Sequence, residues 1–132
     1  MDLGYGAGRI RLPVDGCEGF EVVLPEERPG APDETAEIER ALDEPFGPTI
    51  RDFAGLKAAA IMVSDITRPA PTSKILPPLV RRLEEVGVSE ILVVFGLGTH
   101  RRMTAQEMAL LLEGSASLPS IQHDKDRCVH LG

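Results

Sequence analysis

The chain has 132 residues, of which 42% are hydrophobic and 27% charged, as is typical of one globular domain with its own core. Its net charge is −7 and it holds four Phe, one Tyr and no Trp, so it lacks the basic groups and aromatic rings that nucleic-acid-binding proteins use. No apolar stretch has the length of a membrane span and the N-terminus has no signal-peptide core, so we expect a cytoplasmic protein with neither membrane nor nucleic-acid partners.

Cysteine usage and the charge distribution indicate where the protein is located and what kind of ligand it could bind. Cys17 and Cys128 are far apart and form no CxxC motif, which is typical of reduced thiols in the cytosol. Residues 1–52 carry a net charge of −8, whereas residues 53–132 carry +1. The second part of the chain is therefore compatible with a small anionic ligand.

The N-terminal third is predicted to hold a β-hairpin and one helix. Arg9–Leu12 alternates basic and apolar residues, Phe20–Leu24 is mostly apolar, and the turn around 15–16 would join the two as a hairpin. Asp33 is a candidate helix N-cap, and Pro45 would end that helix. We expect the many acidic residues of this helix to form a solvated face.

The centre of the chain is predicted to form a right-handed βαβ unit over residues 58–96. Ala58–Val63 is an apolar run too short for a helix, and predicts a strand buried on both faces. Ser73–Val86 repeats apolar residues at helical spacing, although prolines at 77 and 78 must either delay the helix or distort its first turn. Glu90–Gly96 is a second apolar strand. The predicted fold class is α/β, with a three-layer, mostly parallel Rossmann-like sheet and an N-terminal β-hairpin.

The last third is predicted to contain one helix and two short strands. Thr104 begins a capping-box pattern, and the helix would run to about Glu113. Ile121–His123 and Arg127–Leu131 have the apolar content of short strands.

A cluster of polar residues follows each of the two central strands. The first cluster contains Ser64, Asp65, Thr67 and Arg68. The second contains Gly98, Thr99, His100 and Arg101. Neighbouring strands lie about 4.8 Å apart, and ligands of open α/β sheets bind just beyond the carboxyl ends of the strands. We therefore expect the two clusters to meet and to form a site.

Each residue type in these clusters has a chemical use. Arg68 offers a planar fork of donors for a phosphate or carboxylate, and Asp65 can accept from a hydroxyl or orient Arg68. His100 can exchange a proton near neutral pH. The alternative is a capped strand-to-helix turn, in which Asp65 and Thr67 only satisfy backbone N–H groups. Three histidines are not expected to bind a metal, because their spacing matches no compact metal motif: His100, His123 and His130.

Three stretches resemble the N-terminal domain of the lactate racemase family, whose members use a nickel-pincer nucleotide. They are SDITRPAPTSKILPPLVRRL at 64–83, ILVVFGLGTHRRMTAQEM at 91–108 and IERALDEPFG at 38–47. The resemblance extends from about residue 9 to the end of the chain. Its most specific part is an S-D-x-T-R-P loop followed by a loop of the G-x-H-R type.

The resemblance implies roles for several residues. The segment that resembles the family's cofactor-binding loop is Asp65, Ile66, Thr67 and Arg68. His100 resembles one of two catalytic histidines, which exchange a proton with the hydroxyl of a 2-hydroxy acid while a hydride moves to the cofactor. Arg68 and Arg101 would bind the anionic substrate.

Family members are several times longer than this chain. Their cofactor-attaching lysine, nickel-binding histidine and second catalytic histidine lie downstream of the matched region. We therefore expect residues 1–132 to be a single N-terminal domain that holds half of an active site and lacks its C-terminal part. A full-length chain would be an isomerase, a 2-hydroxy-acid racemase or epimerase, whereas the isolated domain would be inactive.

The expected partners are a 2-hydroxy acid and the missing C-terminal domain. Two alternatives to the enzyme stay open. One is a non-catalytic module that binds a phosphate or nucleotide, and the other is an assembly domain that forms homo-oligomers.

Overall fold

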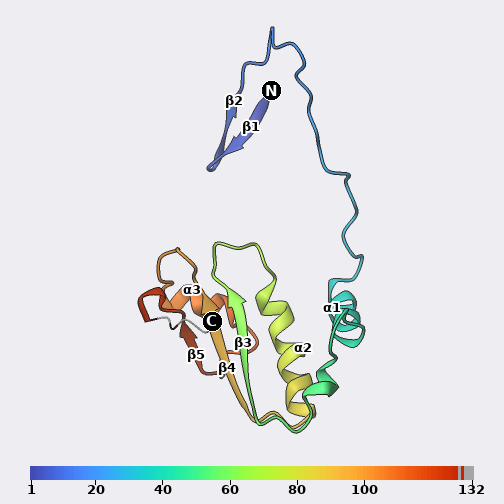
Figure 1. The fold of residues 1–132 in the computed structure, drawn as a ribbon, viewed down its shortest axis with the longest axis vertical. Coiled ribbons are helices and arrows are strands. Elements are labelled where there is room, and N and C mark those ends of the chain that lie inside the picture. The colour runs from blue at the N-terminus through green and yellow to red at the C-terminus, as the bar shows by residue number, and fades with distance from the viewer. Residues whose placement is uncertain (128, 130–132) are drawn as a thin grey trace. The chain divides into compact units, whose positions relative to one another are not determined.

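The computed structural model describes residues 1–127 and 129. The chain forms two compact units, Met1–Gly30 and Ala31–Gly132. The predicted α/β class is confirmed, because the first unit holds an antiparallel hairpin and the second holds a parallel sheet with helices (Figure 1). That residues 1–132 form a single domain stays a prediction.

The first unit contains a tight hairpin of β1 (Asp2–Tyr5) and β2 (Gly8–Arg11). A two-residue turn joins the strands, and Gly6 adopts a φ of 56°, the left-handed conformation that such turns favour. Every residue of both strands is exposed, so the hairpin has no core of its own.

The predicted pairing of Arg9–Leu12 with Phe20–Leu24 is wrong. Most of the first segment forms β2, which pairs with the residues before it, and Phe20–Leu24 lies outside any strand. A two-residue connection closes with a smaller loss of chain entropy than the longer loop that the prediction needs.

The second unit is built on a sheet of three parallel strands: β3 (Ala58–Ser64), β4 (Glu90–Gly96) and β5 (Ser120–Gln122). The strand order is β3-β4-β5, so β4 is central and β3 is an edge strand. Ser64 lies opposite Gly96 at the carboxyl ends of β3 and β4. This register confirms the parallel βαβ unit that the sequence predicts, and aligns the loops that follow the two strands.

The core lies between one face of the sheet and the helices α2 (Thr72–Glu85) and α3 (Ala105–Leu111). Phe95 and Val93 of β4 are fully buried, and Leu76 of α2 is 1% exposed. Burying these side chains supplies the main stabilisation of the unit.

The other face of the sheet is uncovered in the described part of the chain. Residues of β3 alternate between partly buried and exposed, and Met62 is 78% exposed. Ile121 of β5 lies on the same face, because Val94 of β4 is the register partner of both Met62 and Ile121. Ile121 is 52% exposed. The prediction that β3 is buried on both faces is therefore wrong, because β3 is an edge strand and the helices that form the core pack on one face.

Helix α2 keeps both prolines inside its bounds, which begin at Thr72. The helix therefore does not begin at position 77. It contains both prolines and lacks the two backbone N–H groups that they remove. Gly87, with a φ of 97°, follows the helix in the left-handed conformation that ends many helices.

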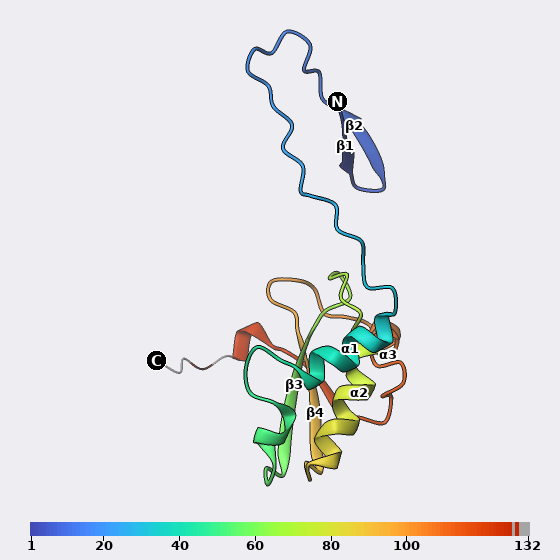
Figure 2. The same cartoon turned by 90° about the vertical axis from the view of Figure 1, so that its right-hand side faces the viewer.

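Helix α1 (Glu34–Asp43) begins at the predicted cap, where the Asp33 side chain accepts from the N–H of Ala36 at 3.0 Å. Its acidic face is not simply solvated. Glu39 accepts from Arg82 of α2 at 2.5 Å and from Arg81 at 2.9 Å. Asp43 also pairs with Arg82. Exposed ion pairs contribute little one by one, but together these fix α1 beside α2 (Figure 2).

The described part of the unit also contains two short 3₁₀ helices, η1 (Ile50–Phe53) and η2 (Lys125–Arg127). Strand β5 nearly coincides with the predicted strand at 121–123. The predicted strand Arg127–Leu131 begins within η2, and its residues 128, 130 and 131 lie outside the described part of the chain. No helix in the described ranges is both long and apolar enough to cross a membrane.

Candidate functional site

The two polar clusters meet at the carboxyl ends of β3 and β4, as the parallel register predicts. A cleft of about 420 Å³ lies there, lined by Ser64, Asp65, Arg68 and residues 96–100. The loop after β3 supplies one wall and the loop after β4 supplies the other.

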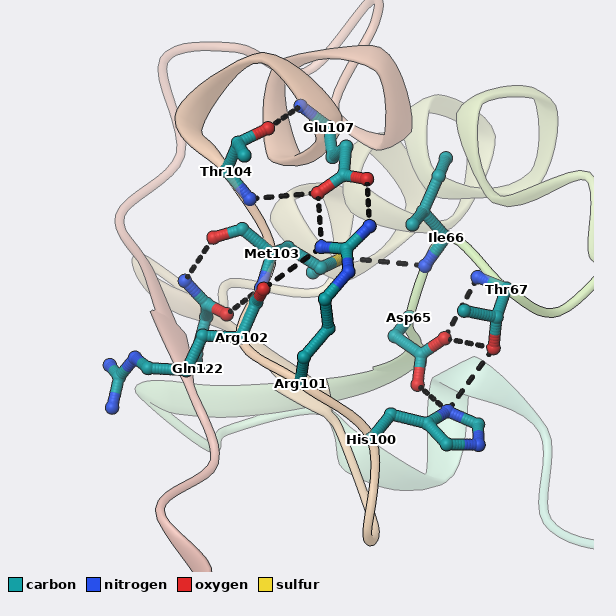
Figure 3. Close-up of polar contacts among 10 residues, drawn as sticks. All are labelled: Asp65, Ile66, Thr67, His100, Arg101, Arg102, Met103, Thr104, Glu107 and Gln122. Atoms are coloured by element: carbon teal, nitrogen blue, oxygen red, sulfur yellow. Dashed lines mark hydrogen bonds and ion pairs between the residues drawn. The ribbon is translucent and has the colours of Figure 1, made fainter.

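The centre of the site is a carboxylate bonded to an imidazole. Nδ1 of His100 lies 2.6 Å from Oδ2 of Asp65. The other carboxylate oxygen, Oδ1, accepts from the backbone N–H of Thr67 at 2.8 Å and from its hydroxyl at 2.5 Å. The Thr67 hydroxyl oxygen is also 3.1 Å from Nδ1 of His100 (Figure 3). Both carboxylate oxygens of Asp65 are thus occupied.

This arrangement fixes the charge of Asp65. The hydroxyl of Thr67 and then the ring of His100 lower the pKa of Asp65 to about 2, against the penalty of burying a side chain that is 4% exposed. The carboxylate is ionised near neutral pH and can only accept hydrogen bonds.

The tautomer of His100 follows from that charge. Because Asp65 accepts, Nδ1 carries the hydrogen that faces it, and a neutral ring then has its lone pair on Nε2. Figure 3 shows the rest of the ring directed away from Asp65. The His100 side chain is 40% exposed and lines the cleft, so a ligand in the cleft can reach the ring. The pair therefore has the geometry of an oriented general base.

The loop after β3 is held by a local turn. The carbonyl of Asp65 accepts from the N–H of Arg68 at 3.1 Å, while its carboxylate accepts from the N–H of Thr67. The capping role that the sequence left as an alternative is therefore present. The same carboxylate also bonds to His100, so the turn and the site use one side chain for both purposes.

Arg68 lines the cleft, and its guanidinium has no ion pair or side-chain hydrogen bond within residues 1–127. Within the described residues the carboxylate of Asp65 bonds to His100 and Thr67, not to the guanidinium of Arg68. An unpaired guanidinium that borders a cleft is available to an anion.

Arg101 has a different environment from Arg68. It donates to both carboxylate oxygens of Glu107 at 2.7 and 2.9 Å. This pairing lowers the pKa of Glu107 to about 2 and raises the pKa of Arg101. The predicted role of Arg101 in substrate binding stays a prediction, since most of its fork is occupied by Glu107.

The capping box predicted at the start of α3 is confirmed. The Thr104 hydroxyl accepts from the N–H of Glu107 at 3.2 Å, and the Glu107 carboxylate accepts from the N–H of Thr104 at 2.8 Å. Sequence reasoning did not include Met103 and Gln122, which bond to the site loops. A methionine in an apolar context and a single glutamine give no pattern that could have identified them.

The low pKa of Asp65 predicts a specific pH dependence of stability. Between about pH 2 and pH 4 the unfolded chain takes up a proton that folded Asp65 does not, so the contribution of Asp65 is complete above about pH 5 and disappears as the pH falls toward 2. In urea unfolding, Asp65→Asn should lower the free energy of unfolding at pH 6, and the difference from the parent should shrink steadily at pH 4 and pH 3. A difference that does not change with pH would show that Asp65 is not ionised in this way.

Comparison with known proteins assigns the chain to a family. Residues 5–132 match the family described as the lactate racemase N-terminal domain. No curated protein matches the chain. The crystal structure of a protein from Thermotoga maritima, a structural genomics target, is similar with 26% identity and a TM-score of 0.59. The match covers 72% of this chain and 22% of that one, so the chain corresponds to about a fifth of the length of that relative. The chain belongs to the lactate racemase N-terminal domain family.

Proposed function

We propose that this domain forms half of the active site of an isomerase that interconverts the stereoisomers of a 2-hydroxy acid. The observation that carries the proposal is the bond between buried Asp65 and accessible His100 at the carboxyl end of the parallel sheet. Membership of the family supports it. A cytoplasmic location, which subcellular fractionation would test, is part of the proposal because Cys17 is a free thiol.

In this proposal His100 is the group that moves the proton. Its Nε2 takes the hydroxyl proton of one stereoisomer of the hydroxy acid as the bond to the α-hydrogen breaks, and returns a proton to that oxygen when the same stereoisomer re-forms. A second histidine outside this chain would do the same for the opposite stereoisomer. Asp65 holds the ring in the required tautomer and stabilises the imidazolium that forms. Thr67 keeps the carboxylate in place through two hydrogen bonds.

The residues present fit part of the nickel-pincer nucleotide that the family resemblance implies. The fork of Arg68 suits the phosphate of a nucleotide. Gly98, with a φ of 55°, has no other atom within 4 Å of the position of a Cβ, so the backbone there is open to a ligand. When bound, the cofactor would supply the acceptor for the hydride that leaves the substrate. Asp65, Ile66, Thr67 and Arg68 would hold it from this domain.

Replacing His100 tests the proposal directly. In the complete protein, loaded with its cofactor, His100→Gln should lower kcat by roughly 10²–10⁴, the usual contribution of a general base. Chiral chromatography of the hydroxy acid measures this rate, and thermal melting checks that the variant is folded. Racemisation at the parental rate would exclude His100 as the proton-transfer group.

A non-catalytic function is the second candidate, and the unpaired guanidinium of Arg68 favours it. If the domain only binds a nucleotide, calorimetry with a nucleoside monophosphate should show binding by the 132-residue chain. Arg68→Ala should abolish that binding. Arg51→Ala is the matched control, because Arg51 lies in η1 and lines a different cleft. Equal binding by the parent and Arg68→Ala would remove Arg68 from the site.

We propose that the uncovered face of the sheet contacts further polypeptide. Parallel sheets are normally covered on both faces, and Met62 and Ile121 are exposed on this one. Light scattering of the 132-residue chain should then show a molecular mass that increases with concentration, with Met62→Lys shifting it toward the monomer. A parent that is strictly monomeric at every concentration would contradict this proposal.

A further inference from the structure

The loop after β3 and the segment after β4 are joined by few polar contacts. Among the described residues, two of these contacts are made by the ring of His100, to Asp65 and to Thr67. A third is independent of that ring. The backbone N–H of Ile66 donates to the thioether sulfur of Met103 at 3.3 Å (Figure 3).

Met103 is itself anchored to the sheet. The side-chain amide of Gln122, on β5, accepts from the N–H of Met103 at 2.7 Å and donates to its C=O at 3.1 Å. A primary amide is able to do both, because it carries an acceptor and a donor side by side. Met103 is 6% exposed, so its polar groups need partners within the protein, and these contacts supply them.

Arg101 is anchored as well, because its guanidinium donates to Glu107 in the first turn of α3. The segment that carries His100 is therefore fixed to α3 and to β5. Within the described residues, its polar contacts with the Asp65 loop are made by two groups, the exposed imidazole of His100 and the buried sulfur of Met103.

We propose that Met103 and Gln122 are positioning residues, which hold the Asp65 loop in register with His100. Gln122 fixes the backbone of Met103, and the Met103 sulfur fixes the backbone of Ile66, next to Asp65. The His100 side chain is 40% exposed, so water competes for its Nδ1 hydrogen whenever the two loops separate. The Met103 link keeps them together. The catalytic part of this inference rests on the proposed function of His100.

The alternative is that Met103 only fills space in the core, to which it belongs. Two substitutions separate these roles. Met103→Leu keeps an apolar side chain of similar volume and removes the acceptor. Met103→Gln returns an acceptor at similar reach, at the cost of a polar group in the core. A packing role predicts that Leu is the better replacement, whereas a positioning role predicts that Gln is.

The primary measurement is the tautomer of His100, read from the ¹⁵N chemical shifts of its ring in the 132-residue chain. We expect the hydrogen on Nδ1 in the parent, a mixture of tautomers in Met103→Leu and in Gln122→Ala, and recovery in Met103→Gln. Met62→Leu is the matched control, because it makes the same replacement at an exposed site on β3 and should keep the parental tautomer.

The second measurement is turnover in the complete protein. Met103→Leu should lower kcat roughly tenfold with KM unchanged within about twofold, since small misplacement of a catalytic group acts mainly on the chemical step. A parental tautomer and kcat in both Met103→Leu and Gln122→Ala would overturn the inference. A tautomer population that is closer to that of the parent in Met103→Leu than in Met103→Gln would also overturn the inference.

The two proposals fail in different ways. If the tautomers behave as expected but the complete parent protein does not racemise hydroxy acids, the proposed function is wrong and the positioning role stands. If the parent racemises and His100→Gln does not, while Met103→Leu and Gln122→Ala are both unchanged, only the positioning role is wrong.

Discussion

The bond between Asp65 and His100 is the interaction on which the candidate site depends. It joins two loops that are 35 residues apart in sequence. It also keeps the Asp65 carboxylate ionised and places the ring hydrogen of His100 on Nδ1. An ionised carboxylate that accepts from Nδ1 leaves Nε2 as the only basic atom of a neutral ring. Thr67 reinforces this by donating twice to the second carboxylate oxygen.

The fold supplies that bond through the register of β3 and β4. Both strands end at the same level, with Ser64 opposite Gly96, and the chain becomes polar immediately beyond. The buried side chains of β4 hold the central strand against α2, and the anchored segment after β4 carries His100. A shift of one residue in the register would move the two loops by about 3.3 Å and break a 2.6 Å contact.

Much of this could be predicted from the sequence. Continuous apolar runs define β3 and β4, helical periodicity and Gly87 define α2, and parallel pairing brings Asp65, Thr67 and His100 together. The hairpin partner of β2 was mispredicted, because the pairing strand β1 precedes β2 across the tight turn at Gly6, whereas the prediction used the apolar segment Phe20–Leu24. Burial of β3 was overestimated, since apolar content does not reveal whether a strand is central or at an edge.

Contacts that depend on single side chains could not be predicted. The resemblance pointed to Asp65 as a residue near the cofactor, but its bond to His100 requires coordinates. The acidic residues of α1 resembled a solvated face, yet Glu39 and Asp43 meet arginines about 40 residues later in the chain. Gln122 and Met103 have no signature, because a single amide or thioether near a site is common in any sequence.

Under the proposed function, the site is half of an active site. The chain corresponds to about a fifth of its Thermotoga maritima relative, and one face of its sheet is uncovered in the described residues. Arg68 lines the cleft from the loop after β3, and the open backbone at Gly98 lines it from the loop after β4. The proposed function includes a second domain that brings the remaining groups and excludes water, which would strengthen every electrostatic interaction within the cleft.

The most direct test of the central claim is a double-mutant cycle between Asp65 and His100. The free energy of unfolding would be measured at pH 7 for the parent, Asp65→Asn, His100→Gln and the double variant. Because the two side chains act as one bonded pair, the account predicts that the double variant loses clearly less stability than the two single losses added together. Additive losses would mean that Asp65 and His100 do not interact in solution, and would contradict the account.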